Sequence, residues 1–201
     1  MRKGMTIGLV TALLAGLVLT SCEQQSPSFR GTVLKPPVSA PDFTLADQHG
    51  QPFRLSEQRG RAVLLYFGYT HCPDACPLTL SKWSEVHEAL GAEAERVRFI
   101  FITVDSERDT SQRLQQHLAT FNADFIGLTG TQVELESVYQ AYGIVHEKAR
   151  SKGSEEGYLM MHNTSAFVID PDGLWRLRHA SITPPEDILQ DVRQLLKRTR
   201  Q

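Results

Sequence analysis

The sequence predicts one α/β domain with a central mixed β-sheet flanked by helices. Apolar runs of strand length recur at residues 61–67, 97–104 and 165–170, and such runs are typical of buried strands. Between them, apolar residues recur every three or four positions, which is the period of a helix face. The chain has 201 residues, and a chain of this length with an N-terminal segment subtracted fits a single domain.

The remaining elements follow from turn signals and periodicity. Apolar alternation on either side of residues 47–50 (DQHG) predicts an N-terminal β-hairpin. Further expected elements are a helix after residue 77 that ends at Gly91, a helix near residues 111–120, a short strand at 124–128, a helix from Thr131 to Gly143, an antiparallel strand at 174–179 and a final helix after Pro184. Residues 144–161 are charged and interrupted by glycine, and we expect an exposed inserted loop or hairpin there.

A β-α-β half followed by a β-β-α half is the order of the thioredoxin-like fold. In open α/β folds, sites form where strands end and helices begin. The segment YTHCPDACP at residues 69–77 lies at such a junction, and it contains both Cys72 and Cys76. The formal net charge of −2 gives no indication of nucleic-acid binding.

The N-terminus has the features of a secretory signal. A positive pair, Arg2 and Lys3, precedes an uncharged apolar run at residues 5–19, which is short for a membrane span. The following Leu-Thr-Ser-Cys, which ends at Cys22, resembles the lipobox of bacterial lipoproteins. The resemblance implies a signal peptide at residues 1–21, lipidation of Cys22 and an extracytoplasmic, periplasmic-side protein anchored to a membrane. The alternative is an uncleaved signal anchor.

Residues 22–38 are polar and contain proline and glycine, so we expect them to be the lipidated N-terminus and a flexible tether. An ordered N-terminal arm is the alternative. The domain itself is expected at residues 39–201.

With Cys22 assigned to processing, Cys72 and Cys76 remain. A disulfide between them could be structural in an oxidising compartment. It would close a very short loop, however, so its entropic stabilisation would be small. The pair is therefore better explained by chemistry.

Pro77 limits the conformation of the thiol segment, because proline disfavours helical geometry in the residue before it. We therefore expect Pro77 to be the first helical residue and Cys76 the N-cap. Cys76 would then lie in the positive field of the helix N-terminus, which favours its thiolate.

Two converging thiols can exchange disulfides or hold a soft metal such as Cu(I). Structural zinc needs four ligands, and the sequence has no second cysteine pair; a peroxidase is a weaker alternative. His162, just before the third buried strand, is the best candidate for a third ligand, although a hydrogen-bonded histidine at a strand edge is the ordinary interpretation. His71 and His146 are weaker candidates, and Met160 and Met161 are better explained by packing.

After about residue 38, the chain resembles the Sco family (SenC/PrrC-like) of copper-binding assembly factors for cytochrome c oxidase. The resemblance rests on residues 68–77 (GYTHCPDACP), 103–110 (TVDSERDT), 158–162 (YLMMH) and 169–173 (IDPDG). The first segment is the most specific, because related thioredoxins have two residues between the cysteines rather than three. Ser106 stands where the family commonly has proline, and Met161 where an acidic residue often precedes the histidine.

The resemblance implies a thioredoxin-like domain that holds copper, as Cu(I) or Cu(II), through Cys72, Cys76 and His162. It implies a metallochaperone that delivers copper to the dinuclear copper centre in the copper-bearing subunit of the oxidase. The alternative is a thiol–disulfide oxidoreductase that uses a redox-active Cys72–Cys76 disulfide to reduce cysteines of that centre or of other extracytoplasmic proteins. An upstream copper donor and a thiol reductant are possible further partners. Asp105 could tune the site through hydrogen bonds, with a turn or capping role as the alternative.

Overall fold

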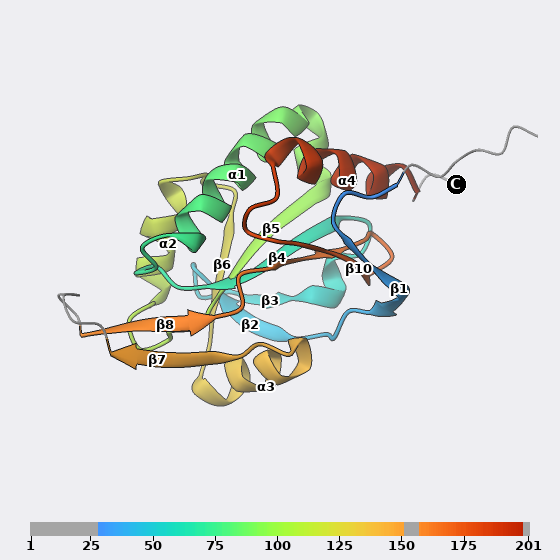
Figure 1. The fold of residues 1–201 in the computed structure, drawn as a ribbon. Coiled ribbons are helices and arrows are strands. Elements are labelled where there is room, and N and C mark those ends of the chain that lie inside the picture. Colours follow the sequence, from blue (N-terminus) through green and yellow to red (C-terminus); the bar gives the residue numbers. More distant parts are fainter. Residues whose placement is uncertain (1–27, 151–156, 199–201) are drawn as a thin grey trace, which may run out of the picture.

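The structure, a computed structural model, describes residues 28–150 and 157–198 of the chain (Figure 1). The strands of its main sheet are β1 (Thr32–Ser39), β2 (Thr44–Asp47), β3 (Pro52–Arg54), β4 (Ala62–Gly68), β5 (Val97–Thr103), β6 (Ile126–Thr129), β9 (Ala166–Ile169) and β10 (Leu174–His179). The helices are α1 (Ala75–Leu90), α2 (Ser111–Ala119), α3 (Gln132–Tyr142) and α4 (Pro185–Arg198), with short 3-10 turns at Leu55–Gln58 and Gly91–Arg96. A separate two-stranded sheet consists of β7 (His146–Arg150) and β8 (Tyr158–His162).

The main sheet has the strand order β1-β10-β9-β4-β5-β6-β2-β3. Its centre is parallel, since β4 pairs with β5 and β5 with β6 in that sense. The flanking strands pair antiparallel. The predicted α/β class with a mixed central sheet is therefore confirmed.

Helices cover both faces of this sheet (Figure 1): α1 and α4 lie together on one face and α3 lies on the other. Every residue of β4 is buried, as expected for a central strand covered on both sides. On the α1 face, the Trp83 ring packs 5.6 Å from that of Phe99. On the α3 face, the Tyr142 ring lies 5.6 Å from that of Phe67. These aromatic layers form the core that fixes the ends of β4 and α1.

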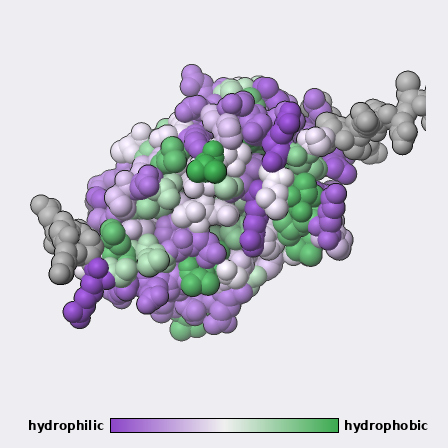
Figure 2. All heavy atoms as spheres, viewed as in Figure 1, coloured by the Kyte–Doolittle hydropathy of each residue, from purple (hydrophilic) through white to green (hydrophobic). Residues whose placement is uncertain are grey.

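The face of the protein shown in Figure 2 is mainly hydrophilic, and its hydrophobic side chains form small, separate patches among polar ones. Large apolar side chains that are exposed include Leu78, Val145, Met161 and Ile182. In the described part of the chain, no helix combines the length and the apolar character required to cross a bilayer.

Two predicted hairpins are present. Strands β2 and β3 pair across the turn, where Asp47 Oδ1 accepts hydrogen bonds from the backbone N–H groups of His49 and Gln51. The expected insertion at residues 144–161 is the β7–β8 hairpin, in which His146 lies opposite His162. Its residues 151–156 lie outside the described residues.

The expectation of a tether as far as residue 38 is wrong for its last part. Strand β1 pairs with β10 at the edge of the main sheet, with an irregular register between Val33 and Val38. Lys35-Pro36-Pro37 lies within that irregularity, and proline is tolerated in an edge strand because no ladder bond is lost there. Such a composition is typical of a linker, which explains the error. Residues 1–27, including the expected signal peptide and Cys22, lie outside the described residues.

A buried carboxylate anchors the segment that precedes β1. The oxygens of Asp191 on α4 accept hydrogen bonds from the backbone N–H groups of Arg30 and Gly31, both at 2.8 Å, and contact His179 Nε2 at 2.9 Å. Burial alone would raise the pKa of Asp191, but these three bonds lower it. The ionised carboxylate therefore connects the N-terminal segment, β10 and α4.

Replacing Asp191 with alanine should lower the free energy of unfolding by about 3–5 kcal/mol, because it leaves the buried His179 and two partly buried backbone donors without their partner. Urea denaturation followed by circular dichroism measures this. The matched control is Asp187→Ala, one turn earlier on α4, whose ion pair with Arg30 is partly exposed. That variant should lose no more than about 1 kcal/mol, and equal losses in the two variants would contradict the anchoring role.

Candidate metal centre

The two cysteines lie on opposite sides of a helix start. Helix α1 begins at Ala75 with Asp74 in the N-cap position, so the expectation that Pro77 begins the helix and Cys76 caps it is wrong. Pro77 is instead the third helical residue, where its missing N–H costs nothing because first-turn N–H groups have no intrahelical partner. Cys76 is therefore within the first turn, and Cys72 lies in the preceding loop.

This arrangement fixes both sulfurs. The backbone N–H of Cys76 donates to Cys72 Sγ at 3.4 Å, so the helix N-terminus contacts the sulfur of the loop cysteine. Cys76 is fully buried under the end of β4. A Cβ atom at Gly68 would lie 2.9 Å from Cys76 Sγ, which explains the glycine at the end of that strand.

The third side chain comes from the other end of the chain. His162 ends strand β8, and its Nε2 lies 3.7 Å from Cys76 Sγ. Its Nδ1 donates to the carbonyl oxygen of Asn163 at 2.8 Å. Since a carbonyl only accepts, this bond assigns the proton to Nδ1 and leaves the Nε2 lone pair facing the thiols. The rings of Tyr66 and Tyr69 meet the imidazole edge-on, with centroids 6.1 and 5.7 Å away.

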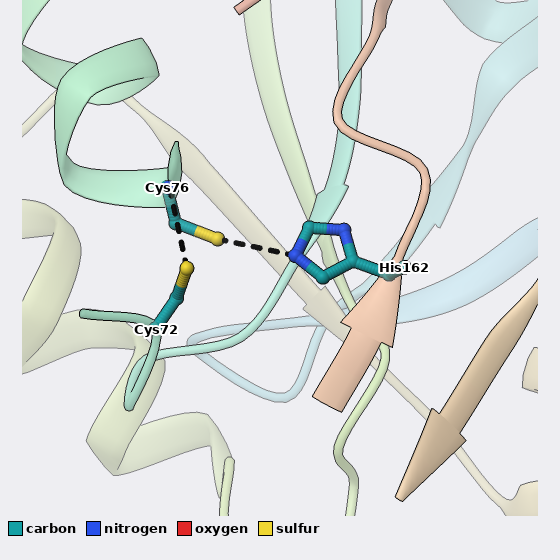
Figure 3. Close-up of side chains that lie close together, drawn as sticks. All are labelled: Cys72, Cys76 and His162. Atoms are coloured by element: carbon teal, nitrogen blue, oxygen red, sulfur yellow. Dashed lines mark hydrogen bonds between the residues drawn. The ribbon is translucent and has the colours of Figure 1, made fainter. Parts of the chain in front are cut away.

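Cys72, Cys76 and His162 thus converge on one point (Figure 3). Their ligand atoms all lie within 4.8 Å of one another. Atoms that share a metal through bonds of about 2.0–2.3 Å can be at most roughly 4.6 Å apart. The cluster therefore fits a metal ion with little movement, and two sulfurs with one imidazole suit a soft ion.

The two thiols have opposite acidities. A hydrogen bond from the Cys76 side chain lowers the pKa of Cys72 to about 4, helped by the backbone N–H groups of Asp74 and Cys76, while burial opposes the shift. Burial raises the pKa of Cys76, and the neighbouring Cys72 raises it further. These pKa shifts favour a thiolate at Cys72 and a neutral thiol at Cys76, opposite to the expectation of a thiolate at Cys76.

Comparisons with known proteins agree with this geometry. The SCO1/SenC family model matches residues 33–197. The chain belongs to the SCO1/SenC family. An SCO2-like protein of Rickettsia felis is 33% identical over 150 residues, which cover 74% of this chain and 73% of that protein. The copper-bound structure of Bradyrhizobium japonicum ScoI is 34% identical, with a TM-score of 0.71 and coverage of 79% of this chain and 99% of that one. Apo Sco1 from Thermus thermophilus is 33% identical, with a TM-score of 0.74 and coverage of 84% of this chain and 97% of that one.

The predicted thioredoxin-like fold is confirmed by its likeness to these Sco structures.

The weaker candidate ligands of this Sco-family protein are directed elsewhere. His71 Nδ1 is 3.1 Å from Thr70 Oγ1, and His146 Nε2 is 3.3 Å from Glu136 Oε2. Met160 belongs to the hydrophobic core, whereas 64% of Met161 is exposed. The two histidines therefore do not join the cluster, and the burial of Met160 agrees with a packing role.

Asp105 is buried, and it bonds to Tyr158 and Arg108 rather than to the three candidate ligands. Its oxygens accept hydrogen bonds from Tyr158 Oη at 2.8 Å and from Arg108 Nε at 2.5 Å. Any influence of Asp105 on the metal centre is therefore indirect, through strand β8. A tuning role for Asp105 stays a prediction.

Sequence reasoning missed the aromatic surroundings of the site. Tyr66 Oη lies 3.8 Å from Cys76 Sγ, and burial raises the pKa of this hydroxyl. The sequence did carry one signal for this contact, because Tyr66 is a hydroxyl-bearing residue within the apolar run that leads to the thiols. Tyr69 and His162 are far apart in sequence, and no pattern along the chain links their rings.

Cys72 should react with iodoacetamide at a rate that changes less than about twofold between pH 6 and pH 8, because a thiol with a pKa of about 4 is already ionised. An ordinary thiol with a pKa of about 8.5 would react about 75-fold faster at the higher pH. Mass spectrometry of the reduced, metal-free protein measures the rate. Cys72→Ser is the control and should abolish rapid labelling, since Cys76 is buried; a rate that rises steeply with pH would contradict the assignment.

Proposed function

We propose that this protein binds copper through Cys72, Cys76 and His162 and acts as a metallochaperone in the assembly of cytochrome c oxidase. The observation that carries the proposal is the convergence of these three side chains at the start of α1. Membership of the SCO1/SenC family supports it. So does the similarity to a Sco protein whose structure has copper bound.

The donor set favours copper over zinc. Thiolates select soft ions such as Cu(I), and an imidazole also suits copper. Structural zinc sites are almost always completed by four protein ligands. Among the described residues, only these three form a cluster of His, Cys, Asp or Glu side chains that could hold a metal. A site with three protein ligands can both accept and release its ion, which suits copper as cargo.

As a metallochaperone, the protein would deliver copper to the dinuclear centre in the copper-bearing subunit of the oxidase.

Thiol–disulfide exchange is a second candidate function, and the different acidities of the two thiols favour it. A half-buried thiolate at Cys72 could attack a partner's disulfide, and Cys76 could then resolve the mixed disulfide. Copper delivery would require an upstream copper donor, and thiol–disulfide exchange would require a thiol reductant.

We further propose that Cys22 is lipidated after removal of residues 1–21, which would hold the domain on the periplasmic side of a membrane. The Leu-Thr-Ser-Cys sequence supports this. Anchoring near the membrane would bring the metal centre close to a membrane-bound oxidase.

Titration of the reduced protein with Cu(I) and Cu(II) should give a 1:1 complex, with a sulfur-to-copper charge-transfer band in the Cu(II) form. His162→Ala should weaken binding by at least about tenfold and alter this band, because one of three ligands is lost. His49→Ala, which changes an exposed histidine in the β2–β3 turn, is the control and should bind normally. A band and an affinity unchanged by His162→Ala would disprove the ligand set.

The same variant separates the two roles. Copper transfer to the metal-free copper domain of the oxidase should fail in His162→Ala. Reduction of that domain's disulfide should continue, since exchange needs only the two thiols. A protein that transfers no copper but reduces the disulfide would be an oxidoreductase.

Cys22→Ser should move the protein from the membrane fraction to the soluble fraction of cells, because no acyl chain can be attached to serine at that position. Immunoblotting of the two fractions measures the distribution, with Cys72→Ser as the control that should stay at the membrane. Retention of Cys22→Ser at the membrane would favour the uncleaved anchor.

A further inference from the structure

We propose that Tyr158 and Arg108 are positioning residues for copper binding, because their contact holds the β7–β8 hairpin so that His162 reaches the two thiols. This inference rests on the proposed function and deepens it. It concerns the protein's own contacts in the metal-free state.

The hairpin needs such a contact because it is not part of the main sheet. Strands β7 and β8 pair only with each other in the described residues. An isolated two-stranded hairpin is marginally stable at best in water. The position of His162 relative to the thiols therefore depends on side-chain contacts between the hairpin and the rest of the domain.

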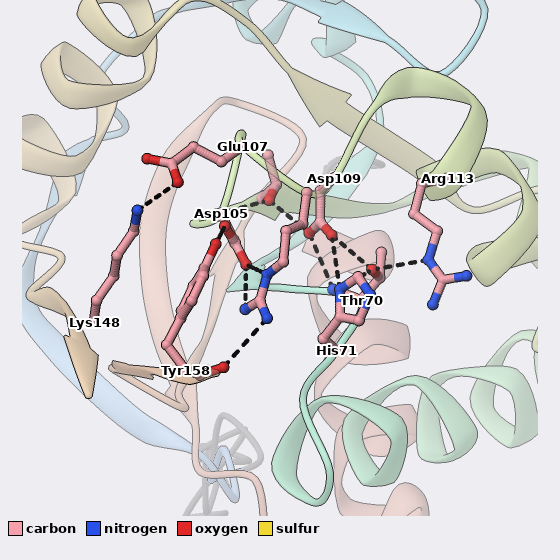
Figure 4. A network of polar contacts seen from close by, with 10 residues as sticks. Thr70, His71, Asp105, Glu107, Asp109, Arg113, Lys148 and Tyr158 are labelled. Atoms are coloured by element: carbon pink, nitrogen blue, oxygen red, sulfur yellow. Dashed lines mark hydrogen bonds and ion pairs between the residues drawn. The ribbon is translucent and has the colours of Figure 1, made fainter. Parts of the chain in front are cut away.

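Tyr158, the first residue of β8, contacts the rest of the domain through its hydroxyl, its ring and its carbonyl oxygen (Figure 4). Its hydroxyl donates to Asp105 Oδ1 at 2.8 Å. The Arg108 guanidinium stacks over its ring at 3.7 Å, and Arg108 Nη1 donates to its carbonyl oxygen at 3.2 Å. Arg108 also pairs with Asp105, so ring, backbone and hydroxyl are all held by one buried ion pair. Stacked and paired in this way, the planar guanidinium cannot be replaced equivalently by lysine.

The loop that provides these groups also holds the thiol segment. In that loop, the backbone N–H groups of Arg108 and Asp109 donate to the Asp105 carbonyl oxygen. Asp109 then accepts hydrogen bonds from the backbone N–H and the hydroxyl of Thr70, two residues before Cys72. One loop thus touches both the strand that carries His162 and the segment that carries the cysteines, and it sets the distance between them.

The distance between Tyr158 and His162 along β8 makes this contact important for the metal. Tyr158 lies four residues from His162, or roughly 13 Å along the strand. When the Tyr158 end is released, a small tilt of the hairpin moves the imidazole away from Cys76. The other ion pair at this end, between Lys148 and Glu107, is exposed and should contribute little.

The test is a double-mutant cycle with Cu(I), in which affinity is measured by competition with a chromophoric chelator. Tyr158→Ala should weaken Cu(I) binding by about 10- to 100-fold, the usual effect of removing a group that orients a ligand. In a His162→Ala background, Tyr158→Ala should have no further effect, because it acts through that histidine. The Cu(II) form of Tyr158→Ala should also lose the nitrogen hyperfine splitting of the imidazole in its EPR spectrum.

Glu147→Gln, an exposed change on the same hairpin, is the matched control, and it should bind Cu(I) as the unmodified protein does. Circular dichroism of each metal-free variant checks folding. Should Tyr158→Ala fail to fold, Tyr158→Phe and Arg108→Lys take its place in the cycle, each with a smaller loss of about three- to tenfold in Cu(I) affinity.

Unchanged affinity in a folded Tyr158 or Arg108 variant would overturn the proposal, and so would an equal loss with and without His162. If His162→Ala itself binds copper normally, the proposed ligand set fails instead, which distinguishes the two outcomes.

Discussion

Asp109 accepts three hydrogen bonds while almost fully buried, and the position of the loop that leads to the two cysteines depends on them. Thr70 donates its backbone N–H at 3.0 Å and its hydroxyl at 2.6 Å, and Thr103 donates its hydroxyl at 2.7 Å. Burial raises the pKa of Asp109, and these bonds act against that shift. A carboxylate in such a place persists only if it is fully bonded. It ties the loop after β4, which leads to the thiols, to the end of β5.

The spacing of the cysteines produces their chemical difference. With three residues between them, Cys76 falls in the first turn of α1 while Cys72 remains in the loop. The helix N-terminus then acts on Cys72, whose sulfur accepts the N–H of Cys76. Cys76 is placed against Tyr66 in the core, where burial favours the neutral thiol. A stabilised thiolate beside a buried thiol serves metal binding as well as disulfide exchange, and this is why both functions remain compatible with one geometry.

Much of the fold could be predicted because its central strands are apolar and its turns carry clear signals. The runs that became β4, β5 and β9 needed no tertiary information, and the family resemblance identified His162. Strand β1 could not be predicted, because its proline-containing sequence is typical of a tether and its pairing depends on β10. The start of α1 was misplaced by two residues because proline is accepted throughout the first turn. Tyr158 and Arg108 meet only through tertiary structure, so no local pattern revealed their contact.

The metal-free site already contains what copper must displace. His162 Nε2 lies 3.7 Å from Cys76 Sγ, and a hydrogen bond from the Cys76 thiol favours the thiolate of Cys72. A Cu(I) ion held by the same three atoms would replace the proton of Cys76, and its charge would compensate the burial that keeps Cys76 protonated. Binding of Cu(I) would therefore exchange one positive charge for another within the same set of donors. Because those donors are held by the loop after β5 and by the start of α1, the protein needs little rearrangement to load copper or to release it.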